Sequence, residues 1–234
     1  MNKKKILVLG PISAQAEDLT LIASILSFLD ENYVLDYIDS LSIMENLPNT
    51  EYYTLWKQKL NPYFHEYDAF FGFSFGGVIL QQCFSLFAAR PKSIILFSTP
   101  TFADASLTSK LSKVIHLCQK EQLEEALNAL YQPVFSPYEM PKIAYNIINR
   151  PLAYQRLIFG LTRVLQTDSS AIVTASPVHY IHLIGEYSDL VNTNNVISSK
   201  DGHLIIVPKA SMRVLQDNPS YCQKVILEAL NHEF

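Results

Sequence analysis

The stretch Gly72-Phe73-Ser74-Phe75-Gly76-Gly77 decides how this chain is interpreted. It has the pattern G-x-S-x-G-G and lies between an apolar run over residues 67–73 and a helix-like run over residues 78–90. In that setting a serine sits on a sharp, strained turn that exposes its hydroxyl above a sheet. Small residues at positions 72, 76 and 77 would let the strand and the helix approach where a Cβ atom would clash. So short a pattern also occurs in ordinary loops, but the context predicts that Ser74 is a nucleophile.

The length and composition favour one large domain with room for an inserted subdomain. Of the 234 residues, 49% are apolar, which is enough for a sizeable core. The formal net charge of −4 argues against general nucleic-acid binding. The cysteines Cys83, Cys118 and Cys222 lack C-x-x-C spacing, so we expect buried or idle thiols in a reducing compartment.

The N-terminal segment does not have the pattern of a signal peptide. Three lysines at positions 3–5 are followed by an apolar run over residues 6–9 only, which is too short for a signal-peptide core. No stretch approaches the length of a membrane span. We therefore expect a soluble, cytoplasmic protein with no membrane partner.

Short β-rich runs alternate with helix-like runs along most of the chain. The expected strands cover residues 5–9, 33–38, 68–73, 93–98, 180–184 and 203–207, and the expected helices cover residues 17–29, 50–64, 78–90, 192–198 and 219–231. Strands separated by helices imply a mostly parallel sheet with helices on both faces, which is the α/β class.

The alternation stops between residues 101 and 165. This segment is mainly helical, with breaks expected at Pro133, Pro137, Pro141 and Pro151. A helical block between the fourth and fifth strands implies a lid over the carboxyl edge of the sheet, so the predicted core covers residues 1–100 and 166–234. The lid carries two more positive than negative charges. That would suit an acidic protein partner, although the small difference favours an ordinary solvated helical surface.

A nucleophilic serine needs hydrogen-bond donors for the oxyanion that forms during acyl transfer. In this arrangement one donor is the backbone N–H of the residue after the nucleophile, Phe75. The other comes from the loop after the first strand, residues 10–14. Pro11 has no N–H, so Ile12 is the better candidate. The alternative is that Gly10-Pro11 is only a turn.

The serine also needs an acid and a base, and the expected chain order is nucleophile, acid, histidine. Asp189, in the loop after the fifth strand, is our choice for the acid, and Glu186 is the alternative. Asp189 could equally be a helix N-cap.

The base is missing from its expected place. The loop after the last strand, residues 209–214, contains no histidine. His203 begins the last expected strand, which spans about 15 Å, so it would lie at the edge of the sheet opposite Ser74. The other histidines are expected in the core, at the wrong edge, on the lid surface or at the exposed C-terminus: His65, His116, His179, His182 and His232.

Taken together, these motifs resemble the α/β-hydrolase superfamily. Within it the chain is similar to the carboxylesterases of biotin synthesis that demethylate pimeloyl-acyl-carrier-protein methyl ester. The segments that carry the likeness are residues 9–12 with Ala16-Glu17, residues 72–77, 98–102, 165–168, 185–191 and 209–212, and Pro219. The resemblance implies Ser74 as nucleophile, Phe75 and Ile12 as oxyanion donors, an acyl ester substrate, and an acyl-carrier protein that docks on the lid. The sequence has no metal-ligand spacing and no phosphate-binding glycine loop, so we expect no cofactor or metal.

The resemblance also identifies three departures. The family's His-Gly before the oxyanion residue is Gly10-Pro11 here. The family's acid position falls on Ser188, one residue before Asp189, and its catalytic histidine falls on Met212. A thioether cannot accept and return a proton near neutral pH. Two hypotheses follow: a serine esterase or thioesterase whose base lies elsewhere, or a catalytically impaired protein of this fold that binds an acyl ligand or a protein partner. The intact serine and glycines favour the enzyme.

Overall fold

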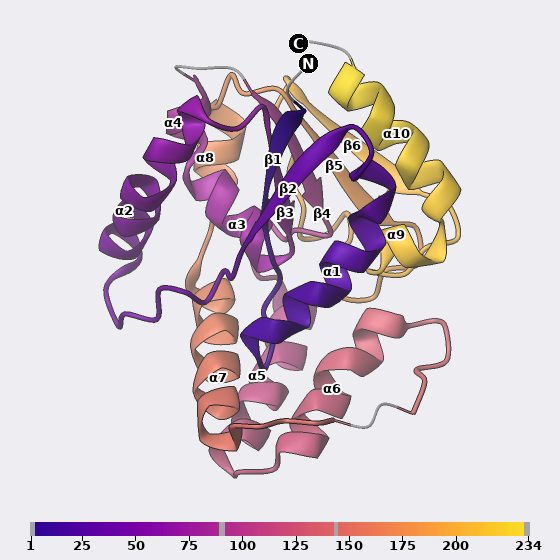
Figure 1. The fold of residues 1–234 in the computed structure, drawn as a ribbon. Coiled ribbons are helices and arrows are strands. Elements are labelled where there is room, and N and C mark those ends of the chain that lie inside the picture. The colour runs from indigo at the N-terminus through magenta and orange to yellow at the C-terminus, as the bar shows by residue number, and fades with distance from the viewer. Residues whose placement is uncertain (1–2, 89–91, 143–144, 232–234) are drawn as a thin grey trace.

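The structure is a computed structural model that describes residues 3–88, 92–142 and 145–231. Within these residues six strands form one parallel sheet with the order β2-β1-β3-β4-β5-β6 (Figure 1). The strands are β1 (Lys4–Leu9), β2 (Tyr33–Ile38), β3 (Ala69–Phe73), β4 (Ser93–Phe97), β5 (Tyr180–Gly185) and β6 (Gly202–Val207). All six strands expected from the sequence are confirmed, as is the α/β class.

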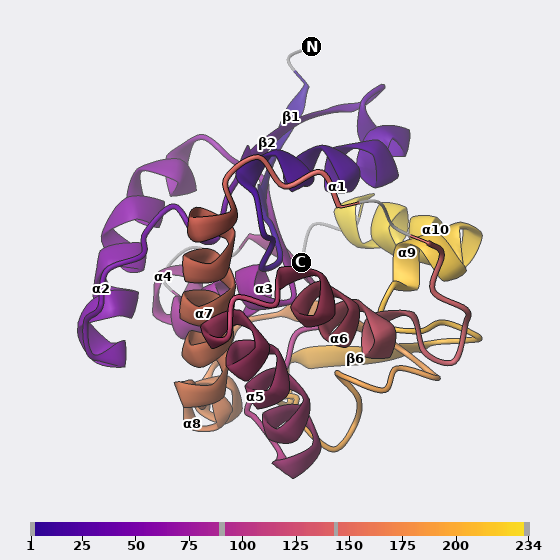
Figure 2. The same cartoon turned by 90° about the horizontal axis from the view of Figure 1, so that it is seen from below.

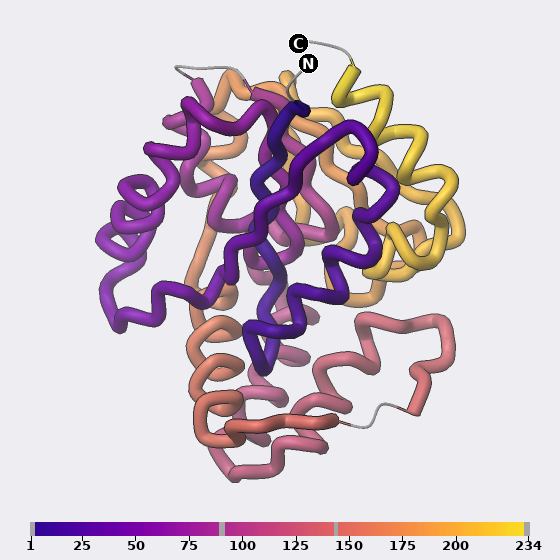
Figure 3. The backbone as a smooth tube through the Cα atoms, in the orientation of Figure 1, coloured from indigo at the N-terminus to yellow at the C-terminus, as the bar shows by residue number. Residues whose placement is uncertain are grey.

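Helices cover both faces of the sheet (Figures 1 and 3). One face carries η1 (Ala16–Asp18), α1 (Leu19–Leu26), η2 (Ser27–Leu29), α9 (Val214–Asp217) and α10 (Pro219–Asn231). The other face carries α2 (Asn49–Leu60), η3 (Asn61–His65), α3 (Phe75–Gln82), α4 (Phe84–Ala88) and α8 (Ser170–Ala175). The predicted helix over residues 78–90 is present as α3 and α4, and its residues 89–90 lie outside the described residues.

Side chains along β1 point alternately to the two faces of the sheet, and each face has its own hydrophobic core. Ile6 and Val8 face the core that contains α1 and α10, whereas Leu7 and Leu9 face the core that contains α2 and α3. Successive side chains of a strand point to opposite faces, so a strand covered on both sides must be apolar throughout. All five residues of β3 are buried, as expected for the strand that leads to Ser74.

The predicted lid, residues 101–165, places its helices beyond the carboxyl ends of the strands, and its residues 143–144 lie outside the described residues (Figures 1 and 2). Its helices are α5 (Ala105–Gln119), α6 (Leu123–Phe135) and α7 (Arg150–Gln166). Pro151 occupies the first turn of α7, where its missing N–H costs nothing. The break expected at Pro133 is wrong, because this proline is buried within the last turn of α6 and the helix ends only at Phe135.

The helix expected over residues 192–198 is also wrong, since this segment is a loop. Asn195 Oδ1 accepts a 3.1 Å hydrogen bond from the Asn192 N–H, and Asn192 Oδ1 accepts one of 3.0 Å from the Asn194 N–H. Asparagine side chains that bind nearby backbone groups compete with helix formation. The backbone here instead bonds to the start of the lid, where the Thr101 N–H donates to the Asn195 carbonyl at 2.8 Å.

Candidate active site at the carboxyl edge of the sheet

Ser74 lies on the sharp turn that the sequence predicts. It is the residue between β3 and α3, with φ 49° and ψ −112°. A left-handed φ at a residue other than glycine costs about 1–3 kcal/mol, and such strain gathers at functional sites. The Ser74 N–H donates to the Phe97 carbonyl at 2.9 Å, which ties the turn to β4. Ser74 is also half-buried within a run of fully buried neighbours.

Two glycines allow this turn to form. A Cβ on Gly72 would lie 2.5 Å from the Cα of Gly77, so β3 and α3 could not approach as they do. A Cβ on Gly76 would lie 2.3 Å from the Leu9 carbonyl oxygen and 2.7 Å from that of Gly10. The first turn of α3 therefore packs directly against the end of β1. The close approach inferred from the small residues is confirmed.

This contact brings together the two backbone segments expected to supply oxyanion donors. Phe75 is the first residue of α3, so its N–H has no acceptor within the helix. Ile12, in the loop after β1, lines the same cavity as Ser74. The site lies where the order of the sheet reverses, between β1 and β3, which is where ligands bind in open parallel sheets.

The cavity has a volume of about 650 Å³ and is bounded by the sheet edge, α1, the lid and the loop before α9. Its lid wall is largely apolar, and the residues involved are Leu107, Leu111, Leu127, Leu130, Val134, Phe135, Ile147, Leu161 and Val164. Ser74, Ile12 and Met212 all line it. The structure thus brings Met212, the expected base position, into the cavity of the predicted nucleophile.

Asp189 is not among the residues that line the cavity. Its carboxylate accepts a 2.7 Å hydrogen bond from Lys110 Nζ of α5, and its side chain is 49% exposed. Ser188 is buried instead, and its hydroxyl accepts from the Val191 N–H at 3.3 Å. Glu186, the alternative acid, accepts from the Lys209 N–H at 2.8 Å. The acid role of Asp189 therefore remains a prediction that this placement does not favour.

None of the five histidines in the described part of the chain lines the cavity. His65, His116, His179 and His203 are exposed, and His232 lies outside the described residues. His182 is fully buried in β5, where its Nε2 accepts from the Thr99 N–H at 3.1 Å. Burial lowers the pKa of His182 to about 3, so its imidazole is neutral. It supports the backbone after β4.

The sequence reasoning missed two features of the cavity. Ser98, at the end of β4, also has a left-handed φ of 44°, and it lines the cavity. Glu17 and Asp18 of η1 line it as well, and burial raises the pKa of the Asp18 carboxyl above its usual value. The sequence does contain a signal for Ser98, because this residue directly follows the apolar run of β4, as Ser74 follows that of β3. No local sequence pattern identifies Asp18.

The described residues contain no group of three or more His, Cys, Asp or Glu side chains placed to hold a metal ion. They also contain no helix that is both long enough and apolar enough to cross a membrane. The cysteines Cys83, Cys118 and Cys222 are unbridged and buried, as expected.

No family model and no curated protein matches this sequence. Many solved structures match its fold. The hydrolase BphD from Rhodococcus sp. strain RHA1, which acts on 2-hydroxy-6-oxo-6-phenylhexa-2,4-dienoate, has a TM-score of 0.77 at 13% identity, over 98% of this chain and 91% of that one. The α/β-hydrolase MGS-M2 from a Medee basin deep-sea metagenome has a TM-score of 0.74 at 14% identity, covering 100% and 91%.

Another similar structure is a bromoperoxidase from Bacillus anthracis, with a TM-score of 0.73 at 12% identity over 99% of this chain and 93% of that one. Proteins named for different reactions thus share this architecture, so the likeness identifies the fold and not the reaction. With its parallel sheet, its serine at the turn after β3 and its helices over the carboxyl edge, this chain has the α/β-hydrolase fold.

Proposed function

We propose that this protein is a serine hydrolase that cleaves an acyl ester or thioester bound in the cavity beneath the lid. The observation that carries the proposal is the backbone of Ser74, which is held in a strained conformation at the cavity wall. A strained backbone does not help a core to pack. At a nucleophile, however, the strained turn exposes the hydroxyl to the substrate.

In the proposed reaction the Ser74 hydroxyl oxygen attacks the carbonyl carbon of the substrate. The resulting oxyanion accepts hydrogen bonds from the N–H groups of Phe75 and Ile12. The bond to the alcohol or thiol then breaks, and water hydrolyses the acyl-serine ester. No histidine among the described residues lines the cavity, so in this proposal water takes the serine proton and returns a proton to the departing alcohol or thiol. An oxyanion hole and substrate binding alone leave about 10³- to 10⁴-fold acceleration over the uncatalysed reaction.

The apolar wall contributed by the lid supports an acyl chain as the substrate class. A finer assignment, the methyl ester of pimeloyl-acyl-carrier protein in biotin synthesis, rests on the sequence resemblance. An acyl-carrier protein would dock on the lid. Four of the seven lid cations are already engaged within the chain, namely Lys110, Arg150, Arg156 and Arg163, so the basic surface is smaller than the sequence suggests.

A second candidate is a protein of this fold that binds an acyl ligand or a protein partner without turning it over. Met212 favours it, because the side chain at the expected base position cannot transfer a proton. The two candidates share the cavity and differ only in the chemistry at Ser74.

The deciding experiment compares hydrolysis of short-chain nitrophenyl esters by the wild type and by Ser74→Ala. We expect slow hydrolysis by the wild type and loss of that activity in the variant. Displacement of a fluorescent fatty acid, measured in parallel, reports binding. Equal hydrolysis rates in both proteins would reject the nucleophile, and retained fatty-acid binding would then favour the second candidate.

A further inference from the structure

Helix α7 of the lid presents one buried face to the loops that follow β1 and β2. Arg156, Gly160 and Arg163 lie four and then three residues apart, so they share that face. All three are buried. The first two contact the loop after β1, which is the loop that carries Ile12.

Arg156 joins the loop after β1 to the loop after β2. Its Nε donates to the Ser13 carbonyl at 3.1 Å, and its Nη2 donates to the Ser13 hydroxyl at 3.3 Å. Its two Nη atoms bind the two carboxylate oxygens of Asp39 at 2.8 and 3.0 Å. Arginine presents donors in a rigid planar fork, so this pair fixes orientation as well as distance.

Two more contacts hold the same loop against the lid. A Cβ on Gly160 would lie 2.9 Å from Cγ1 of Ile12, so the backbone of α7 packs directly on the Ile12 side chain. The Gln15 amide pairs with the segment before α7: its Nε2 donates to the Asn146 carbonyl at 3.1 Å, and its Oε1 accepts from the Ile148 N–H at 2.9 Å.

Residues 11–15 belong to no helix or strand, so they lack the regular backbone hydrogen bonds of those elements. A backbone donor stabilises an oxyanion only if it is oriented before the reaction. We propose that Arg156 is the positioning residue of the oxyanion hole, holding the loop after β1 so that the Ile12 N–H faces the carbonyl oxygen bound at Ser74. This inference rests on the proposed hydrolase function.

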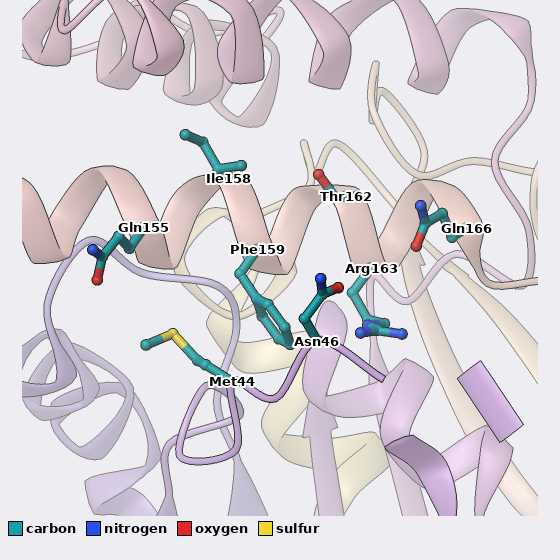
Figure 4. Close-up of a pocket in the computed structure, with 8 residues that line it drawn as sticks. All are labelled: Met44, Asn46, Gln155, Ile158, Phe159, Thr162, Arg163 and Gln166. Carbon is teal, nitrogen blue, oxygen red and sulfur yellow. The ribbon is translucent and has the colours of Figure 1, made fainter. Parts of the chain in front are cut away.

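Arg163 provides a matched control on the same helix. Its Nη1 donates to the Leu47 carbonyl at 2.9 Å and to Asn49 Oδ1 at 2.7 Å, and its guanidinium stacks on Tyr52 and Phe159. It lines a groove with a volume of about 430 Å³ between α7 and the segment that carries Met44 and Asn46. Figure 4 shows the Arg163 side chain next to Asn46. Arg163 therefore secures residues 45–49, whereas Arg156 secures residues 12–15.

The kinetic test compares Arg156→Lys and Arg163→Lys, each of which keeps the positive charge but loses the planar fork. A third variant, Arg156→Gln, removes the positive charge as well and is measured provided that it folds. We expect kcat for nitrophenyl esters to fall by about 10-fold in Arg156→Lys and about 100-fold in Arg156→Gln, with KM within twofold of wild type, because an oxyanion donor acts mainly in the transition state. Arg163→Lys should keep kcat within twofold. Equal falls in both Lys variants, or a change confined to KM, would overturn the positioning role.

A second measurement does not depend on activity. Amide hydrogen exchange of residues 12–15 should become at least 10-fold faster in Arg156→Lys and stay at the wild-type rate in Arg163→Lys. Unchanged exchange in Arg156→Lys would overturn the positioning role even if the enzyme is active. A third outcome is faster exchange in Arg156→Lys together with no Ser74-dependent hydrolysis by the wild type. That result would confirm that Arg156 holds the loop after β1 and would reject the proposed hydrolase function.

Discussion

The hydroxyl of Ser98 donates a 2.7 Å hydrogen bond to the backbone carbonyl of Met212. This bond joins the end of β4 to the loop after β6, and both residues line the cavity that contains Ser74. The loop is also fixed from within, because the buried hydroxyl of Ser211 donates to the Asp217 carboxylate. The segment where a histidine is expected is therefore firmly held, and a methionine occupies the site.

Met212→His should restore a base to this cavity. We expect Ser74-dependent hydrolysis of nitrophenyl esters to rise by about 10-fold or more, because a positioned general base contributes about 10²- to 10⁴-fold and no acid has been shown to orient this one. A new inflection in the pH–rate profile near pH 6.5 should accompany the gain. The double variant Ser74→Ala/Met212→His serves as the control and should stay inactive. A folded Met212→His protein with the wild-type rate would show that position 212 does not reach the serine.

Asp189→Asn should have little effect on catalysis. The carboxylate pairs with Lys110 at a half-exposed position, where such a pair contributes at most about 1 kcal/mol to the free energy of unfolding. We expect kcat to change by less than threefold and urea unfolding to show a loss of about 1 kcal/mol or less, matched by Lys110→Met. A 10-fold or larger fall in kcat for Asp189→Asn alone would instead support the acid role inferred from the sequence.

His182 should make the fold sensitive to acid. Burial lowers its pKa to about 3 in the folded state, whereas the unfolded chain has the ordinary value of about 6.5. The unfolded chain therefore binds the extra proton, so the stability present above pH 6.5 is lost as the pH falls towards 3. The slope from this one group reaches about 1.4 kcal/mol per pH unit.

The measurement is urea unfolding of the wild type and His182→Gln between pH 7 and pH 4. Glutamine still offers an oxygen to the Thr99 N–H but does not titrate, so the free energy of unfolding should fall less steeply in the variant. His116→Gln, at an exposed position on α5, should keep the wild-type slope. Parallel slopes for the wild type and His182→Gln would mean that folding does not lower the pKa of the imidazole.

The strands and the turn at Ser74 could be predicted because their signals are local. Buried strands appear as short apolar runs. The glycines at positions 72 and 76 indicate that strand and helix backbones pack closely at the turn, and the G-x-S-x-G-G pattern contains that information. The helix expected over residues 192–198 failed because asparagine side chains bond to the local backbone and to the lid, and an apolar pattern does not report such bonds.

The sequence alone determined the α/β architecture and the serine at the turn, because both depend on residue type and spacing along the chain. The assignment of Met212 to the base position is what the family resemblance implies. Only the tertiary structure decided that Asp189 faces Lys110, that Ser98 holds the Met212 loop, and that Arg156 reaches from the lid to Ser13. Those contacts join residues between 79 and 143 positions apart. Side chains that meet at such separations are placed by the packing of whole elements, and no local pattern records which way they turn.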